Sequence, residues 1–359
     1  MAKLRLLVVE DSVTVREALV DCLKQDRDLD VVAVTGNGAQ AVELCKKHRP
    51  DAITMDMMLP GMTGLEATEM IMAYCPTPIL IVSSSTNRAE VFRTYEALAA
   101  GAVDVLDKPS AEGLTEEWGS RLRSAIKIVS KIKVITHPRA RLEVSREKPG
   151  FEPHTVEVPK FRSPTCVAIG ASTGGPGALV QVLKGLGASF PLPVLIVLHI
   201  SNPFGASFAE WLDSQSPLPV RFAKDKEPIP DPGKGCVLLA PPDFHLIVKG
   251  GFLRITNDPE RHSCKPSVGT LFESMAREMG KQTIACLLTG MGKDGAAGML
   301  AVRKAGGLTL AQDERTSLIF GMPKEAIEIG GAEQVLPLGD FAPLLLALAQ
   351  KKQTVLSFL

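Results

Sequence analysis

Two series of short apolar runs, each alternating with longer helix-like segments, constrain the fold of this chain more than any other feature of its sequence. In the first series, strands are predicted at residues 4–9, 31–34, 52–55, 79–82 and 103–106. Short strands that alternate with helices are typical of a parallel sheet with helices on both faces. A helical pattern over residues 115–133 closes the series. The sequence therefore predicts an amino-terminal α/β domain with a doubly wound, five-stranded parallel sheet.

A stretch of mixed charge without sustained periodicity interrupts the alternation. It contains Pro138, Pro149, Pro153 and Pro159, which is typical of a linker. The alternation then resumes, with strands predicted at residues 166–169, 194–198, 236–240, 284–288 and 308–311. We therefore predict a first domain over residues 1–133, a linker over 134–163, and a second α/β domain with a parallel sheet over 164–359.

The composition is that of a globular protein without a net charge. Of 359 residues, 45% are hydrophobic, and 40 basic residues balance 40 acidic ones. Because there is no net basic field, binding of nucleic acid is not expected. The apolar runs are too short for a signal peptide or a membrane span, so membrane insertion is not expected either. The seven scattered cysteines are an odd number and favour a reducing, cytoplasmic location.

Three acidic residues of the first domain directly follow predicted strands. Glu10 and Asp11 follow the first strand and Asp56 follows the third, so they are expected at one edge of the sheet. Clustered carboxylates raise one another's pKa, and Mg²⁺ relieves their repulsion. Ser83 and Lys108 at the ends of the fourth and fifth strands add a hydroxyl and a cation. Each residue alone could be a helix cap or a loop residue, but together they predict a phosphoryl pocket.

This set of residues, with the segment over 59–64, resembles the receiver domain of bacterial response regulators. The resemblance implies that Asp56 accepts a phosphoryl group from a histidine kinase and that the three acids hold Mg²⁺. It also implies that Ser83 and Lys108 contact the phosphoryl group. Val105 departs from the family pattern, because receivers often carry Tyr or Phe three residues before the lysine.

The second domain opens with a strand that runs into the glycine-rich turn Gly170-Ala171-Ser172-Thr173-Gly174-Gly175. A phosphate-binding loop would need a closing Gly-Lys-Ser/Thr, and a dinucleotide fingerprint would need glycine in place of the serine. The pattern Gly-x-Ser-x-Gly fits a nucleophile elbow, which exposes a serine hydroxyl beside backbone N–H groups. The pattern alone fits a purely structural glycine turn equally well.

A serine nucleophile needs a base and an acid, and the second domain offers both at strand ends. Of the six histidines in the chain, His199 directly follows a strongly apolar run, whereas His245 lies in or beside a strand and His262 in a polar loop. Asp294 lies in a glycine-rich loop after another apolar strand, where a carboxylate can orient the imidazole. We therefore predict Ser172, His199 and Asp294 as the catalytic residues, in a chain order unlike the three best-known triads.

Further segments carry a specific resemblance. Residues 241–245, 288–295, 311–314 and 320–323 are similar to those of the CheB family, the protein-glutamate methylesterases of bacterial chemotaxis. Together with the receiver, this resemblance covers nearly the whole chain and implies a carboxyl-terminal α/β hydrolase domain. It implies hydrolysis of glutamate γ-methyl esters on chemoreceptors, often with deamidation of receptor glutamines. The implied cofactor is Mg²⁺ for receiver phosphorylation, with none for the esterase reaction.

The same resemblance implies roles for individual residues. The triad falls on Ser172, His199 and Asp294, and the backbone N–H groups of Thr173 and Met291 are implied as oxyanion donors. In addition, a glycine stands at position 269, where family members commonly carry an acid.

An alternative of a different class is a non-catalytic receiver protein, which would drain phosphoryl groups from a kinase and use its second domain only for docking. The retention of a serine, a histidine and an acid favours the enzyme. We expect phosphorylation to regulate hydrolysis, with the linker allowing the receiver to block the Ser172 site until Asp56 is phosphorylated.

Overall fold

The computed structural model describes residues 3–84, 87–108, 115–132, 134, 155–156, 164–200, 202–350 and 356–357. The chain divides into two compact units, Met1–Glu147 and Lys148–Leu359. Most of the linker predicted over residues 134–163 lies outside the described residues. Within it, the short strand β6 (Thr155–Val156) pairs antiparallel with β16 (Leu356–Ser357), a pairing that the sequence does not predict.

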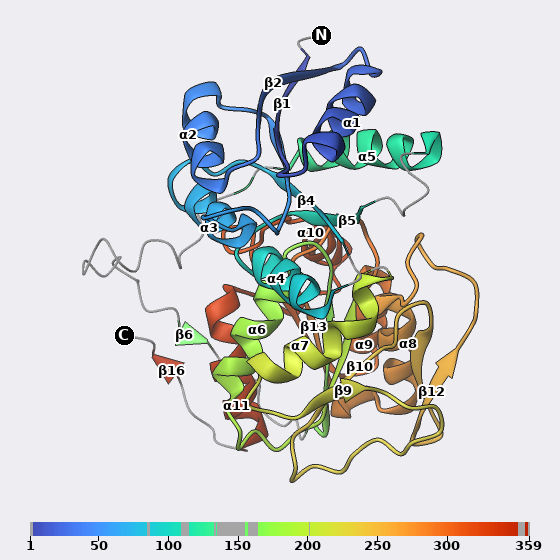
Figure 1. Ribbon diagram of the computed structural model, residues 1–359. Coiled ribbons are helices and arrows are strands. Elements are labelled where there is room, and N and C mark those ends of the chain that lie inside the picture. Colours follow the sequence, from blue (N-terminus) through green and yellow to red (C-terminus); the bar gives the residue numbers. More distant parts are fainter. Residues whose placement is uncertain are drawn as a thin grey trace. The chain divides into compact units, whose positions relative to one another are not determined.

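The first unit is built on a five-stranded parallel sheet in the order β2-β1-β3-β4-β5. Four of its strands, β1, β2, β4 and β5, are labelled in Figure 1. Its strands are β1 (Leu4–Val9), β2 (Leu29–Thr35), β3 (Ala52–Met55), β4 (Ile79–Ser83) and β5 (Asp104–Asp107). The five predicted strands are confirmed, with ends that differ by no more than two residues. β3 and β4 are buried along their whole length, as is typical of central strands in a sheet covered on both faces.

Helices cover both faces of this sheet. They are α1 (Val13–Lys24), α2 (Gly38–His48), α3 (Gly64–Tyr74), α4 (Arg88–Ala99) and α5 (Glu116–Val129). α1 packs against α5, and α3 packs against both α2 and α4, so the sheet lies between two helical layers. The side chain that precedes each helix accepts a backbone N–H bond; these caps are Ser12, Asn37, Thr63, Asn87 and Thr115. The closing helix predicted over residues 115–133 is confirmed as α5, which ends earlier, at Val129.

The second unit contains a seven-stranded parallel sheet in the order β15-β14-β13-β7-β8-β10-β9. In that order the strands are Gln334–Leu336, Leu308–Gln312, Thr283–Leu287, Cys166–Ala171, Val194–Leu198, Val237–Leu239 and Val220–Phe222. The five predicted strands form its middle. The edge strands β9 and β15 were not predicted, because each has only three residues and is partly exposed. The hairpin of β11 (His245–Lys249) and β12 (Phe252–Thr256) was also missed.

The helices of this unit are α6 (Gly175–Leu186), α7 (Phe208–Gln215), α8 (Val268–Glu278), α9 (Ala296–Lys304), α10 (Met322–Glu328) and α11 (Phe341–Ala349). Short 3₁₀ helices span Phe204–Ser207, Gly280–Gln282 and Leu338–Asp340. α9 packs against α8 and α10, and α6 packs against α7 and α11. The core joins the central strands to α8, α9 and the hairpin, with Leu195, Leu246, Phe272 and Leu287 among its fully buried residues.

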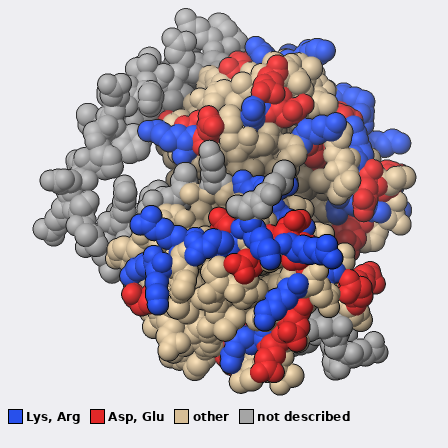
Figure 2. All heavy atoms as spheres, turned by 90° about the horizontal axis from the view of Figure 1, so that it is seen from above, with Lys and Arg blue, Asp and Glu red and all other residues tan. Residues whose placement is uncertain are grey.

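The surface carries both signs of charge. On the face drawn in Figure 2, Lys and Arg side chains are interspersed with Asp and Glu, as the equal numbers of basic and acidic residues lead one to expect. Within the described residues, no helix is both long and apolar enough to cross a membrane.

Candidate functional site

The acidic cluster predicted in the first unit is formed. Glu10 and Asp56 directly follow the adjacent strands β1 and β3, and the Asp56 N–H donates to the Val9 carbonyl. One carboxylate oxygen from each of Glu10, Asp11 and Asp56 lies within 4.8 Å of the other two. Glu10 and Asp56 are buried, whereas Asp11 is exposed. The cluster therefore has two buried acids and one that faces solvent.

Lys108 binds both buried carboxylates. Its Nζ lies 3.0 Å from Glu10 Oε2 and 3.0 Å from Asp56 Oδ1. Burial alone would lower the pKa of Lys108, but the charges of Asp56 and Glu10 outweigh it and raise that pKa. Burial raises the pKa of Glu10 to about 7 and raises that of Asp56 as well, and Lys108 only partly opposes both shifts. One ammonium group thus does not fully stabilise the buried negative charge.

This environment suits a hard divalent cation. Asp56 Oδ2 is buried and has no hydrogen-bond partner within the described residues, so it is available as a ligand. Three carboxylates within reach of one point are the oxygen donors that Mg²⁺ prefers, and a cation would stabilise their charged forms. The residues present therefore fit Mg²⁺.

Ser83 lies at the predicted edge of the sheet, but its hydroxyl is engaged elsewhere. The Ser83 carbonyl accepts the Lys108 N–H at 2.9 Å. The Ser83 Oγ donates to Glu90 Oε1 at 2.7 Å and makes no hydrogen bond to the Asp56 or Lys108 side chain in the described part of the chain. Glu90 was missed by the sequence analysis, because nothing in its local pattern marks a buried acid on α4.

In the second unit, Ser172 and His199 leave neighbouring strands side by side. Ala171 pairs with Leu198 at the ends of β7 and β8, and the His199 N–H donates to the Ala171 carbonyl at 3.0 Å. The residues that follow this pair, Ser172 and His199, therefore lie about one strand spacing apart, roughly 5 Å. Gly174, in the left-handed region at φ 78°, then lets the chain turn into α6.

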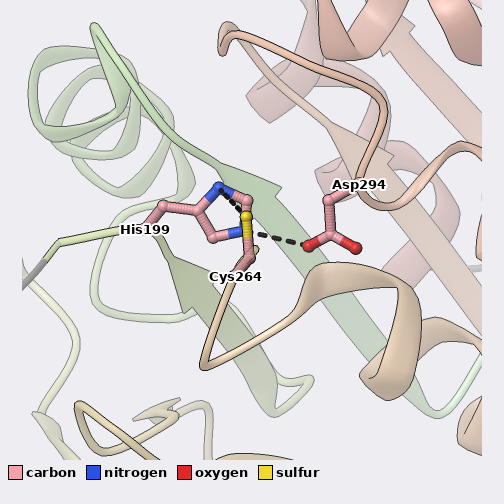
Figure 3. A group of neighbouring side chains, drawn as sticks. All are labelled: His199, Cys264 and Asp294. Carbon is pink, nitrogen blue, oxygen red and sulfur yellow. Dashed lines mark hydrogen bonds and ion pairs between the residues drawn. The ribbon is translucent and has the colours of Figure 1, made fainter. Parts of the chain in front are cut away.

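His199 and Asp294 are in direct contact, as Figure 3 shows. Asp294 Oδ2 lies 2.9 Å from His199 Nε2, and the Cys264 Sγ lies 3.7 Å from His199 Nδ1. Burial would lower the pKa of His199, but hydrogen bonds to Asp294 and Cys264 outweigh it and raise the pKa to about 9. The predicted base and acid are thus brought together, and the thiol of Cys264, which the sequence analysis missed, completes the surroundings of the imidazole.

Asp294 is held by the start of α8. Its Oδ1 accepts the Ser267 hydroxyl at 2.8 Å and the Gly269 N–H at 3.1 Å, and its Oδ2 accepts the Val268 N–H at 2.6 Å. Burial raises the pKa of Asp294, but His199 and these donors outweigh it and lower the pKa. The N-terminus of a helix is a favourable place for an anion. Because Gly269 contributes through its backbone N–H, this contact needs no side chain at position 269.

The loop that follows β13 brings a second set of backbone groups to Ser172. The Ser172 N–H donates to the Thr289 carbonyl at 3.0 Å, and a Cβ atom on Gly290 would lie only 2.8 Å from the Ser172 Cβ. In the described part of the chain, the N–H groups of Thr173 and Met291 donate to no protein acceptor. The Ser172 hydroxyl makes no hydrogen bond to His199 among these residues.

The other histidine candidates have structural environments. His245 begins β11, and its Nδ1 accepts the Ser267 N–H at 3.1 Å while its Nε2 lies 3.0 Å from the Pro259 carbonyl. This fully used imidazole anchors the loop that carries Cys264. His262 is exposed at the tip of the same loop.

Comparisons with known proteins point to one family. A family model described as CheB methylesterase matches residues 167–345, and one described as response regulator receiver domain matches residues 6–117. A protein-glutamate methylesterase/protein-glutamine glutaminase of Nitrosospira multiformis is 40% identical over 357 residues, which cover 97% of this chain and 98% of that protein. Another, from Anaeromyxobacter dehalogenans, is 40% identical over 94% of each chain. The crystal structure of the Thermotoga maritima CheB methylesterase catalytic domain matches with 39% identity and a TM-score of 0.49, covering 52% of this chain and 99% of that one.

Proposed function

We propose, because this chain belongs to the CheB family of methylesterases with a receiver domain, that it hydrolyses γ-methyl esters of glutamate and side-chain amides of glutamine in chemoreceptors. The observation that carries the catalytic assignment is the His199–Asp294 pair, 2.9 Å apart, beside Ser172 on the neighbouring strand end. No observation favours the alternative of a non-catalytic docking module.

Ser172 is the nucleophile of this reaction. Its Oγ attacks the side-chain carbonyl carbon of the substrate while His199 takes the hydroxyl proton. Collapse of the tetrahedral intermediate breaks the bond to the methoxy group, and His199 returns the proton so that methanol leaves; with glutamine, ammonia leaves instead. Water then attacks the acyl-enzyme, with His199 again as base, and releases glutamate and free Ser172.

The negative charge of each intermediate needs donors. The Thr173 N–H belongs to the turn of Ser172, and the Met291 N–H belongs to the loop whose Gly290 approaches Ser172. Each such donor typically contributes a factor of about 10²–10³ in rate. Asp294 fixes the imidazole and stabilises its charged form. Because Asp294 itself accepts three further hydrogen bonds, it holds His199 without moving.

The receiver supplies regulation. Asp56 accepts a phosphoryl group from a phosphohistidine of a kinase, so that a P–N bond breaks as a P–O bond to the carboxylate forms. Glu10, Asp11 and Asp56 would hold Mg²⁺, which neutralises charge on the transferred group. Lys108, already bound to Asp56, stabilises the phosphorylated product. The partners that this function requires are a histidine kinase and methylated chemoreceptors.

The test is release of methanol from a chemoreceptor labelled at its methyl esters. Wild-type protein should release labelled methanol, and Ser172→Ala should lower the rate by more than about 1,000-fold. The control is Ser214→Ala on α7, where the Ser214 hydroxyl donates to the Trp211 carbonyl and accepts the Gln215 Nε2 amide, and no rate change is expected. Full activity of Ser172→Ala would remove it as the nucleophile, and an inactive wild-type protein would overturn the proposed function.

A further inference from the structure

Thr289 is hydrogen-bonded to two residues of the nucleophile turn, Ser172 and Thr173. Its carbonyl accepts the Ser172 N–H at 3.0 Å, and its Oγ1 donates to the Thr173 carbonyl at 2.9 Å. The same Oγ1 accepts the Ile319 N–H at 2.9 Å. Thr289 is only 2% exposed, so these bonds form away from water, where a misplaced polar group costs most.

Thr289 is itself held in place by a buried amide. Its N–H donates to Gln312 Oε1 at 2.7 Å, and Gln312 Nε2 donates to the Thr316 carbonyl at 2.7 Å. Gln312 is fully buried at the end of β14. The main chain from Thr289 continues through Gly290 to Met291. Thr289 is therefore hydrogen-bonded to Thr173, one proposed oxyanion donor, and covalently connected to Met291, the other.

We propose that Thr289 is a positioning residue that sets the spacing between the Thr173 and Met291 N–H groups, and that Gln312 fixes Thr289 for this task. The inference rests on the proposed esterase function. A donor stabilises the transition state only when it lies within hydrogen-bond distance of the oxyanion, which forms after the substrate has bound. Loss of the Thr289 hydrogen bonds that position these donors should therefore lower kcat and leave KM nearly unchanged.

The experiment compares Thr289→Val, Thr289→Ser and Thr309→Val in the full-length protein. Thr309 is an equally buried threonine on β14 whose Oγ1 accepts the Glu333 N–H at 3.0 Å, so its variant controls for loss of a buried hydroxyl. Thr289→Val should lower kcat by about 10- to 100-fold with KM within about twofold. Thr289→Ser should restore kcat to within about threefold, and Thr309→Val should keep it.

A second measurement separates this inference from the function on which it rests. A fluorophosphonate probe reacts with Ser172 through a P–O bond, releasing fluoride, and its rate depends on the same oxyanion donors without any receptor. Thr289→Val should slow labelling by a similar factor, and Gln312→Met by a smaller one. Thr289→Val with the kcat and labelling rate of Thr309→Val would overturn the inference. Absence of methanol release by wild-type protein would overturn only the proposed function.

In the first unit, the Glu90 carboxylate on α4 is hydrogen-bonded to Ser83. Glu90 is buried on α4, and its Oε1 accepts both the Ser83 hydroxyl and the Ser84 N–H at 2.7 Å. Thr94 Oγ1, one turn further along α4, lies 3.0 Å from the Glu90 carbonyl and 3.3 Å from the Ser83 Oγ, and it can donate to one of them at a time. A hydroxyl has one proton to donate, so the Ser83 proton cannot serve Glu90 and a phosphoryl group on Asp56 at the same time.

We infer that Glu90 holds the Ser83 hydroxyl away from the phosphoryl site in the unphosphorylated receiver. The hydrogen bond between Ser83 and Glu90 then breaks when Asp56 is phosphorylated. Because Glu90 belongs to the first turn of α4, loss of its hydrogen bond to Ser83 would change the contacts of that helix when Asp56 is phosphorylated. The inference rests on Asp56 as the acceptor, which Asp56→Asn tests separately.

The experiment titrates the full-length protein with acetyl phosphate and Mg²⁺ and measures the phosphorylated fraction by mass. A hydrogen bond to a charged acceptor is about twice as strong as one to a neutral acceptor. Glu90→Gln should therefore lower the half-maximal acetyl phosphate concentration by about three- to tenfold. Glu90→Asp, whose shorter side chain retracts the carboxylate, should act in the same direction. Glu96→Gln is the matched loss of charge on α4 and should change nothing; a Glu90→Gln protein that behaves like Glu96→Gln would overturn the inference.

Discussion

His199 holds Asp294 through Nε2 at 2.9 Å and faces Cys264 through Nδ1 at 3.7 Å, so its two ring nitrogens have different tasks. A neutral imidazole has one N–H donor and one acceptor nitrogen. Since the charged Asp294 requires a donor, the proton lies on Nε2 and the lone pair on Nδ1. With Ser172 as the proposed nucleophile, Nδ1 is the nitrogen left to receive its proton, which would reverse the arrangement of the chymotrypsin-type triad.

Ester hydrolysis should increase with pH up to about 9. His199 acts as a base only when neutral, and its pKa is raised to about 9 because hydrogen bonds to Asp294 and Cys264 outweigh burial. Below that pH the neutral fraction grows about tenfold per unit. The measurement is kcat/KM from pH 6 to 10, and Asp294→Asn should move the inflection to lower pH. A wild-type profile that is already flat at pH 7 would contradict the raised pKa.

The same proton should stabilise the folded protein. The folded pKa of His199, about 9, lies above the unfolded value of 6.5. The stabilisation is therefore fully present below about pH 6.5 and is lost as pH rises to about 9. The free energy of unfolding in urea should thus decrease across this window in wild-type protein. His199→Gln should show a smaller decrease, and equal slopes in the two proteins would contradict this linkage.

Cys264 should raise the pKa of His199 without acting as the nucleophile. Its hydrogen bond is one of the contacts that raise the pKa of His199. Cys264→Ala should therefore move the inflection of the kcat/KM profile to lower pH while hydrolysis persists. Cys236→Ala, at another half-buried cysteine, is the control and should leave the profile unchanged. Loss of all activity in Cys264→Ala would instead make the thiol a reacting group.

The fold was largely predictable because parallel strands buried on both faces are continuous apolar runs. β3 and β8 match their predicted bounds residue for residue. The edge strands β9 and β15 have no such signal, because only part of each is buried. The β11–β12 hairpin connects through Gly250 and Gly251, both at positive φ. Such a pair favours a tight turn, and it was the signal available in the sequence.

The site was predictable only to the extent that strand ends converge. Ser172 was predicted from its glycine-rich turn, Asp294 from a glycine-rich loop after a strand, and His199 and Asp56 from their places directly after apolar runs. Residues that act through long-range side-chain contacts carry no local signal; Ser267, 27 positions from Asp294, is one of them. Nor does the sequence say which nitrogen of His199 faces Asp294, because this depends on how the loop with Cys264 packs.

Mg²⁺ should bind the receiver more tightly as pH rises through 7. Burial, together with the charge of Asp56, raises the pKa of Glu10 to about 7 despite Lys108. Below that pH a cation must displace a proton, so affinity should level off only above it. Calorimetry in buffers of different ionisation enthalpy should detect proton release at pH 6 and little at pH 8. Glu10→Gln should abolish the proton release, and pH-independent affinity would contradict the assignment.

Ser267→Ala should weaken the anchoring of Asp294 while the Asp294 carboxylate itself is retained. Ser267 donates to Asp294 Oδ1 at 2.8 Å, and its Oγ also caps α8 by accepting the Thr270 N–H at 3.2 Å. Loss of a helix cap costs about 1 kcal/mol, and loss of a hydrogen bond to a charged group about 1.5–3 kcal/mol. The free energy of unfolding should therefore fall by about 2.5–4 kcal/mol.

Catalysis should respond as well, because Asp294 keeps its contact with His199 but loses one of the bonds that hold it still. We expect kcat to fall by about three- to tenfold, with KM nearly unchanged. Ser274→Ala is the matched control, since Ser274 is equally buried on α8 and its hydroxyl donates to the Leu271 carbonyl at 2.7 Å. That variant should be destabilised while its kcat stays at the wild-type value. If both variants lose stability and neither loses kcat, the backbone donors at Val268 and Gly269 alone suffice to hold Asp294.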